Sequence, residues 1–236
     1  MIFYIILILF IIINIQGIYK INKINLDSKI LTLQSQNEID IQEAIKELNP
    51  LLIHNLSSRN EKIRNLTLEK IIQMNPGYII QDNSKNISLD YFLKKDYPQM
   101  SLYENRYIIS DIGIQSSLDN IIKYFCNTFS CNKKHSLNIF KGNQITKIQK
   151  QKNKICLITQ IQNNSTYYLF HPKYKNDILN KENNKIKKWG NKIIMEPGIV
   201  LSIPPNWYYF CESNTISIMC KSICDDYFSY LYNLVK

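Results

Sequence analysis

The sequence predicts a mainly β domain, a double-stranded β-helix, with short helices before it and an apolar transmembrane helix at its N-terminus. Three patterns carry this prediction. From residue 136 onward, short runs rich in Ile, Tyr and Thr recur about every ten residues, and Asn, Gly and Pro separate them. Before residue 126, capping residues precede short apolar stretches that Pro or Gly ends. Residues 1–19 contain no charged side chain.

The N-terminal segment has the length and composition of a membrane anchor. Residues 2–15 are almost uninterrupted Ile, Leu, Phe and Tyr, and no charge appears before Lys20. A bilayer core needs roughly 20 apolar residues, with a lower limit of about 17. No basic residue precedes the segment and no small-residue cleavage site follows it, which favours an uncleaved anchor over a signal peptide. We therefore predict a single-pass protein, bound to the membrane through residues 1–19.

The orientation of this anchor stays open. Lys20, Lys23 and Lys29 follow the apolar segment, so the positive-inside rule favours a cytosolic C-terminal domain. Sequons such as those at Asn55 and Asn65 would instead suit a lumenal domain, although chance supplies several in a chain so rich in Asn.

Residues 20–36 are polar without a clear period and are expected to form a linker, and residues 37–236 a single domain. Within the domain, Asp40 and Glu43 form a capping box for a helix at 41–48, which Pro50 ends. The other elements expected before residue 126 are helices at 68–74, 89–95 and 119–125 and strands at 51–54, 78–81 and 107–109.

The second half of the chain reads as strands followed by one helix. The expected strands are, in chain order, 136–140, 146–151, 155–161, 166–170, 192–195, 199–203, 207–212 and 215–220. Residues 225–235 are then expected to form an amphipathic helix, with Tyr227, Phe228, Leu231 and Leu234 on one side.

The composition limits the classes of partner. The net charge is +10, yet the lysines are scattered and only three of the 29 basic residues are Arg, the usual bidentate reader of phosphate and guanine. Nucleic-acid binding is therefore not expected. The favoured residues, Ile, Asn, Lys and Tyr, share A/T-rich codons, so we interpret the skew as genome bias, as in an A/T-rich virus or host.

Two stretches near the C-terminus resemble a known family. Residues 160–172 read Q-I-Q-N-N-S-T-Y-Y-L-F-H-P, and residues 198–213 read G-I-V-L-S-I-P-P-N-W-Y-Y-F-C-E-S. They are similar to motifs of the cupin-like, JmjC-type 2-oxoglutarate oxygenases, which include the asparaginyl hydroxylase acting on hypoxia-inducible factor. Those motifs run roughly Q-I-x-G-x-K-x-x-x-L-F-P-P and G-D-x-L-x-I-P-x-x-W-W-H-x-V-E-S. The resemblance covers about residues 37–222 and implies a JmjC-like fold.

The resemblance also implies where an iron site would lie. The family binds Fe(II) with two His and one carboxylate, and these positions fall on Gln149, Gln151 and Tyr209. Carboxamides are weak neutral donors, and a phenol with a pKa of about 10 is a poor ligand at neutral pH. The metal positions are therefore degenerate, and no metal and no catalytic residue are expected.

The cosubstrate positions differ from the family as well. Its lysine for the 2-oxoglutarate carboxylate falls on Ser165, while Thr146 matches a threonine that contacts the cosubstrate in some members. Thr146, Ser165 and Trp207 are therefore candidate pocket residues, with core packing as the alternative for Trp207.

These observations favour a catalytically inactive pseudo-oxygenase without a cofactor, anchored to a membrane and serving as a binding or scaffold module for a protein or small ligand. The alternative is an active Fe(II)- and 2-oxoglutarate-dependent protein hydroxylase or demethylase with atypical ligands. Metal-dependent turnover of 2-oxoglutarate separates the two.

The His and Cys residues suggest no further site. His54, His135 and His171 are expected in loops or at the surface. The spacing Cys126-x4-Cys131-x3-His135 lacks the paired C-x2-C pattern of a zinc site. Cys156, Cys211 and Cys220 lie in apolar strands and are expected in the core. In a lumenal domain, Cys126–Cys131 and Cys220–Cys224 would be candidate disulfides.

Overall fold

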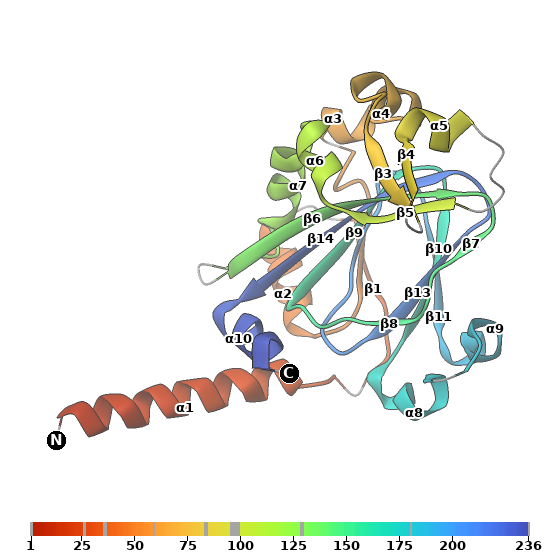
Figure 1. The fold of residues 1–236 in the computed structure, drawn as a ribbon. Coiled ribbons are helices and arrows are strands. Elements are labelled where there is room, and N and C mark those ends of the chain that lie inside the picture. Colours follow the sequence, from red (N-terminus) through yellow and green to blue (C-terminus); the bar gives the residue numbers. More distant parts are fainter. Residues whose placement is uncertain are drawn as a thin grey trace.

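A computed structural model describes residues 2–25, 27–34, 37–58, 60–82, 85–94, 100–127, 130–179 and 181–235. These residues form a mixed α/β fold with two open sheets, one of seven and one of five strands (Figure 1). The predicted double-stranded β-helix is therefore wrong. The spacing of apolar runs located most strands, but it did not show that residues before position 126 add strands to one of the sheets.

The larger sheet takes strands from both halves of the chain. In spatial order it holds β1 (Leu31–Leu33), β2 (Leu51–Ile53), β12 (Val200–Ser202), β9 (Ile155–Gln162), β14 (Ser217–Asp226), β6 (Ser130–Lys141) and β5 (Met100–Asn105). β1 and β2 run parallel, and the other neighbours run antiparallel. The long strand β14 thus pairs with β9 on one side and with β6 on the other.

The smaller sheet is built from the second half of the chain alone. Its order is β11 (Asn191–Met195), β10 (Ser165–Phe170), β13 (Tyr208–Ser213) and then β7 (Gln144–Ile145) and β8 (Gln149–Lys150), which both pair with β13. Its neighbours are antiparallel. The segment β7–β8 therefore forms one edge of this sheet.

Short helices complete the domain. They are α2 (Glu38–Lys46), α3 (Glu61–Arg64), α4 (Leu68–Met74), α5 (Leu89–Lys94), α6 (Tyr107–Asp111), α7 (Gln115–Ile122), α8 (Lys175–Ile178), α9 (Asn183–Ile186) and α10 (Tyr227–Val235), with 3-10 turns η1 (Pro172–Tyr174) and η2 (Lys187–Trp189). A small hairpin, β3 (Ile79–Asp82) with β4 (Lys85–Ser88), lies beside α5.

Local capping explains which predicted elements hold. The helix at 68–74 is confirmed, and the Thr67 side chain accepts a hydrogen bond from the backbone N–H of Lys70. The helix expected at 41–48 begins earlier, because Asn37 rather than Asp40 caps it. The strand expected at 107–109 is wrong: this stretch is α6, and Asn105 Oδ1 accepts from the N–H of Ile108 in its first turn.

The larger sheet is covered on one face by helices of the first half of the chain. Buried apolar residues of these helices, including Ile41, Ile109 and Leu118, share a core with Leu137 and Leu157 of the sheet. Figure 1 shows α6 and α7 lying along β6.

The other face of the larger sheet packs against the smaller sheet. Residues alternate between the two faces of a strand, and β10 shows the result. Tyr167 and Leu169 belong to the core between the sheets, whereas Tyr168 and Phe170 join Phe210 in a separate outer core. The segments α8, α9 and η2 cover that outer core. The fold therefore stacks helices, large sheet, small sheet and helices in four layers.

The N-terminal helix α1 (Ile2–Asn22) extends away from the sheets (Figure 1). Its apolar side chains are largely exposed, and Gly17 packs on Phe228 of α10 so closely that a Cβ there would lie 2.6 Å from the ring. Among the described residues, no helix is both long and apolar enough to cross a membrane. The predicted transmembrane anchor, its membrane partner and its single-pass localisation are therefore wrong.

We expect the two faces of the larger sheet to contribute comparably to stability. Leu157→Ala, on the helical face, and Leu169→Ala, between the sheets, each remove a fully buried side chain and should lower the free energy of unfolding by about 3 kcal/mol. Ile194→Ala, at a half-exposed site of β11, should stay within about 0.5 kcal/mol. Urea denaturation measures all three, and a near-neutral Leu169→Ala would contradict the packing of sheet on sheet.

Candidate functional site

The structure brings two of the three degenerate metal positions together. Gln149 of β8 lies opposite Tyr209 of β13, and the Tyr209 hydroxyl donates a hydrogen bond of 2.9 Å to Gln149 Oε1. Gln151 does not join them. It is 2% exposed, its side-chain amide donates to the carbonyl of Asn153, and its backbone N–H donates to that of Trp207. The side chains at the expected iron positions therefore form hydrogen bonds with one another or with the backbone.

Side chains fill the space between the sheets beside Tyr209. The remaining cavity has a volume of about 10 Å³, room for about one water molecule. Tyr167, Cys211 and Met219 line it, and the Tyr167 hydroxyl contacts Met219 Sδ at 2.7 Å. Burial raises the pKa of the Cys211 thiol to about 12, which keeps it protonated. Among the described residues, no cluster of three or more His, Cys, Asp or Glu side chains is arranged to hold a metal ion.

The three candidate pocket residues lie in different environments and do not form one pocket. Thr146 lines the small cavity, and its hydroxyl accepts a hydrogen bond from the N–H of Cys211. Ser165 donates to Gln160 Oε1 at 2.6 Å within a buried polar network. Trp207 is 2% exposed and packs edge-on against His171, so its environment is that of a core residue.

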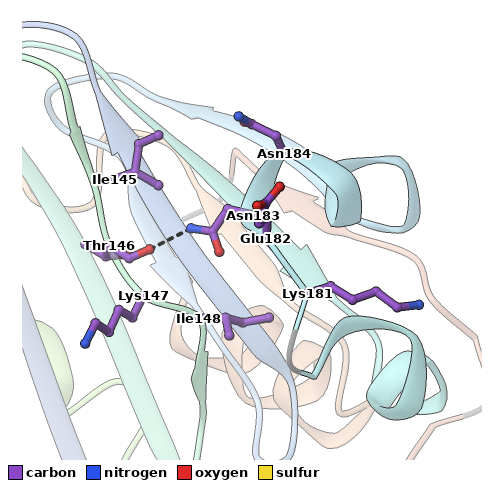
Figure 2. A pocket seen from close by; sticks show the side chains of 8 residues that line it. All are labelled: Ile145, Thr146, Lys147, Ile148, Lys181, Glu182, Asn183 and Asn184. Carbon is purple, nitrogen blue, oxygen red and sulfur yellow. Dashed lines mark hydrogen bonds between the residues drawn. The ribbon is translucent and has the colours of Figure 1, made fainter.

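A larger, open pocket of about 610 Å³ lies on the outer side of Thr146 (Figure 2). Residues 145–148, from the end of β7 to the residue before β8, form one wall, and residues 181–184, from the loop after α8 into the first residues of α9, form the other. The Asn183 side chain donates a 2.9 Å hydrogen bond to the carbonyl of Thr146 and ties the two walls together. This pocket was missed in the sequence, because its walls are about 35 residues apart and carry no motif.

The charged groups of this pocket lie at its rim. In Figure 2 the ammonium groups of Lys147 and Lys181 point away from the centre, toward opposite sides. Lys181 Nζ lies 4.9 Å from the ring centre of Trp189. Glu182 forms an ion pair of 3.1 Å with Lys185 outside the pocket. The rim therefore carries two lysine ammonium groups and one carboxylate, around a floor of aliphatic and amide groups.

Two of the three histidines are buried, contrary to the expectation of loop or surface positions. His171 is 2% exposed, and its Nε2 lies 2.6 Å from the carbonyl oxygen of Asn25. His135 is 7% exposed and lies between α7 and the large sheet. Sequence reasoning missed this because contacts from distant parts of the chain help to bury the rings: Asn25 and Trp207 for His171, and Ser222 for His135.

His135 belongs to a row of three groups that resembles a Ser-His-Asp triad. Its Nδ1 lies 2.7 Å from Ser222 Oγ, and its Nε2 lies 3.1 Å from Asp119 Oδ1. A nucleophilic serine needs room for a substrate, whereas Ser222 is 2% exposed and lines neither cavity. These contacts instead tie α7 to strands β6 and β14.

Comparison with known proteins adds no relative: no family model and no curated sequence matches the chain. The resemblance to JmjC-type oxygenases accordingly rests on the two motifs alone.

The hydrogen bond between Tyr209 and Gln149 should be a measurable part of the stability. Tyr209→Phe leaves Gln149 Oε1 without this donor and should cost about 1 kcal/mol of unfolding free energy. Tyr167→Phe is the matched control: the Tyr167 hydroxyl donates to Met219 Sδ, a weak acceptor, so removing it should cost less. Equal costs in urea denaturation would contradict this assignment.

Proposed function

We propose that this chain is a non-catalytic binding module that recognises an acidic peptide segment of a partner protein at the pocket between residues 145–148 and 181–184. The observation that carries the proposal is the contrast between its two cavities. The space between the sheets is filled to about 10 Å³, whereas the pocket beside it is open and holds about 610 Å³.

The chemistry of the inter-sheet residues supports a role without catalysis. Gln149 and Tyr209 hydrogen-bond to each other, and Gln151 bonds to the main chain. Binding a metal there would break these contacts and gain two neutral amides and a phenol in return, which are weak donors. A cavity of about one water molecule also leaves no room for 2-oxoglutarate.

The shape and lining of the open pocket favour a peptide over a small molecule. Small-molecule sites enclose most of their ligand, whereas this pocket is broad and open to solvent. Ile145 and Ile148 offer apolar contact, and the amides of Asn183 and Asn184 offer donors and acceptors for a main chain. Lys147 and Lys181 at the rim, in a chain of net charge +10, favour acidic side chains in the partner.

Reversing the rim charges should weaken binding. Fluorescence anisotropy of a labelled 12-residue peptide rich in Asp and Glu measures the affinity of the full chain, with a basic peptide of equal length for comparison. The double variant Lys147→Glu/Lys181→Glu should bind at least about tenfold more weakly. Lys173→Glu/Lys175→Glu, which reverses the charge of two exposed lysines outside the pocket, should bind like the parent chain.

Two outcomes would overturn this assignment: no preference for the acidic over the basic peptide, or equal losses in the two double variants. The first outcome would exclude acidic peptides as the ligand class. The second would reduce the effect to the overall charge of the protein.

The oxygenase alternative has its own test. The full chain, incubated with Fe(II), ascorbate and 2-oxoglutarate, should form no succinate above the rate in buffer, and metal analysis should find well below one equivalent. Succinate formation that depends on the chain and is lost in Gln149→Ala would establish catalysis and sink the non-catalytic proposal.

A further inference from the structure

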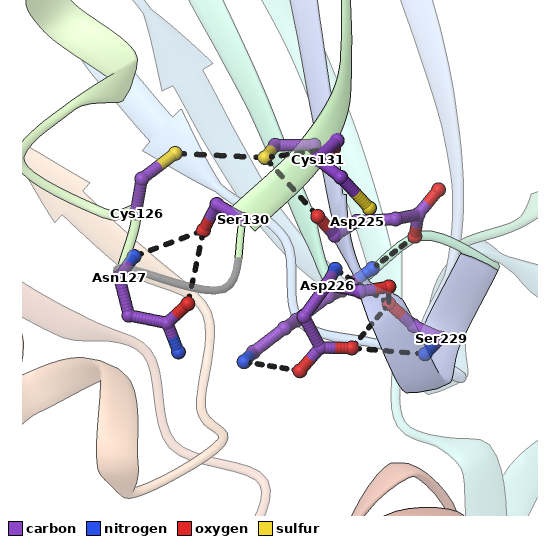
Figure 3. Close-up of polar contacts among 9 residues, drawn as sticks. Cys126, Asn127, Ser130, Cys131, Asp225, Asp226 and Ser229 are labelled. Carbon is purple, nitrogen blue, oxygen red and sulfur yellow. Dashed lines mark hydrogen bonds and ion pairs between the residues drawn. The ribbon is translucent and has the colours of Figure 1, made fainter.

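Two cysteines that are 98 residues apart in the chain meet in the structure (Figure 3). Cys126 follows α7, Cys224 lies in the central strand β14, and their Sγ atoms are 3.5 Å apart. That distance is close to van der Waals contact, and a disulfide bond of about 2.05 Å requires a shift of only about 1.5 Å. We propose that Cys126 and Cys224 form a reversible disulfide that joins the turn after α7 to β14.

The geometry selects this pair over those suggested by the sequence. Cys220 and Cys224 lie four residues apart on one strand, which separates them by roughly 13 Å and excludes a bond between them. Cys131 presents its backbone carbonyl to Cys224 Sγ, at 3.3 Å, and not to Cys126. Cys156, Cys211 and Cys220 are buried in the core.

The two thiols differ in a way that suits exchange. Cys126 is partly exposed, and the hydrogen bond with Cys224 lowers its pKa to about 6, helped by Ser130 and by the charges of Lys133 and Lys154. Cys224 has a raised pKa, because the same contact and its burial favour the protonated form. Cys126 is therefore the attacking thiolate and Cys224 the resolving thiol.

The reaction needs an oxidant, and a small-molecule disulfide such as oxidised glutathione supplies it. The Cys126 thiolate attacks one sulfur of that disulfide, its S–S bond breaks, and one thiolate leaves. Cys224 then gives up its proton and attacks Cys126 Sγ, which expels the second thiolate. Two protein thiols are oxidised, one small disulfide is reduced to two thiols, and excess thiol reverses both steps.

Closing this loop of about 98 residues should stabilise the fold. The bond restricts the unfolded chain, and it fixes the turn after α7 to β14, which lies between β9 and β6 in the large sheet. The oxidised protein should melt about 5–10 °C above the reduced protein.

The test equilibrates the reduced full chain in glutathione buffers of different redox ratio, blocks free thiols with N-ethylmaleimide, and maps the cross-links by mass spectrometry. The tryptic peptide of residues 124–133 contains both Cys126 and Cys131, so additional chymotrypsin, which cuts after Phe129, is needed to separate them. A peptide linking Cys126 to Cys224 is expected in the parent chain and in Cys131→Ser. Cys126→Ser should lose it.

A link between Cys126 and Cys131, or a stable mixed disulfide of Cys126 with glutathione, would overturn the proposal. So would a folded protein that stays fully reduced in oxidised glutathione. The map of the parent chain decides the question even if a variant misfolds, and circular dichroism shows whether Cys126→Ser keeps its fold.

The rate of exchange gives a second measurement. In Cys131→Ser, reaction with a chromogenic disulfide should rise with pH to a plateau with a midpoint near pH 6, because the thiolate of Cys126 reacts. Lys133 and Lys154 face this thiolate, with Asp225 and Asp226 nearby. Cys224→Ala removes the largest cause of the lowered pKa and should move the midpoint upward. A midpoint near 8.5 in both variants would contradict the pairing.

Discussion

The structure depends on the need to cover both faces of the seven-stranded sheet. Its middle strand β9 is buried along nearly its whole length, so neither face can be left to water without a large loss of hydrophobic stabilisation. Helices from the first half of the chain cover one face, and the smaller sheet covers the other. Residues such as Leu157 and Leu169 belong to different layers for this reason.

The smaller sheet then has an outer face of its own, and its cover creates the open pocket. Tyr168, Phe170 and Phe210 require the segment from η1 to η2 to pack over them. Residues 181–184 in that segment come to lie across the sheet edge from residues 145–148, and the bond from Asn183 to Thr146 fixes the distance between the walls. The site proposed for partner binding thus lies beside the outer core of the smaller sheet, and Ile148 belongs to both.

Local signals in the sequence predicted much of the secondary structure, and long-range contacts decided what they missed. Thr67 caps α4 as expected, and most strands after residue 130 lie where alternation of apolar residues places them. Gln149 and Tyr209 are cross-strand partners on β8 and β13. The addition of β1 and β2 to the larger sheet, by contrast, depends on the pairing of β2 with β12, about 150 residues later in the chain. The contact of Cys126 with Cys224 spans 98 residues, and no local pattern encodes it.

The position of β14 has a consequence for how the protein is made. This strand is among the last elements of the chain, yet it lies between β6 and β9 near the middle of the large sheet. β2 likewise pairs with β12, which follows it about 150 residues later in the chain. During synthesis the edges of β6 and β9 therefore stay unpaired until the ribosome has delivered residues 217–226, a topology that slows folding and leaves strands open to wrong partners. Assembly of the larger sheet therefore waits for residues 217–226, which are made after both β6 and β9.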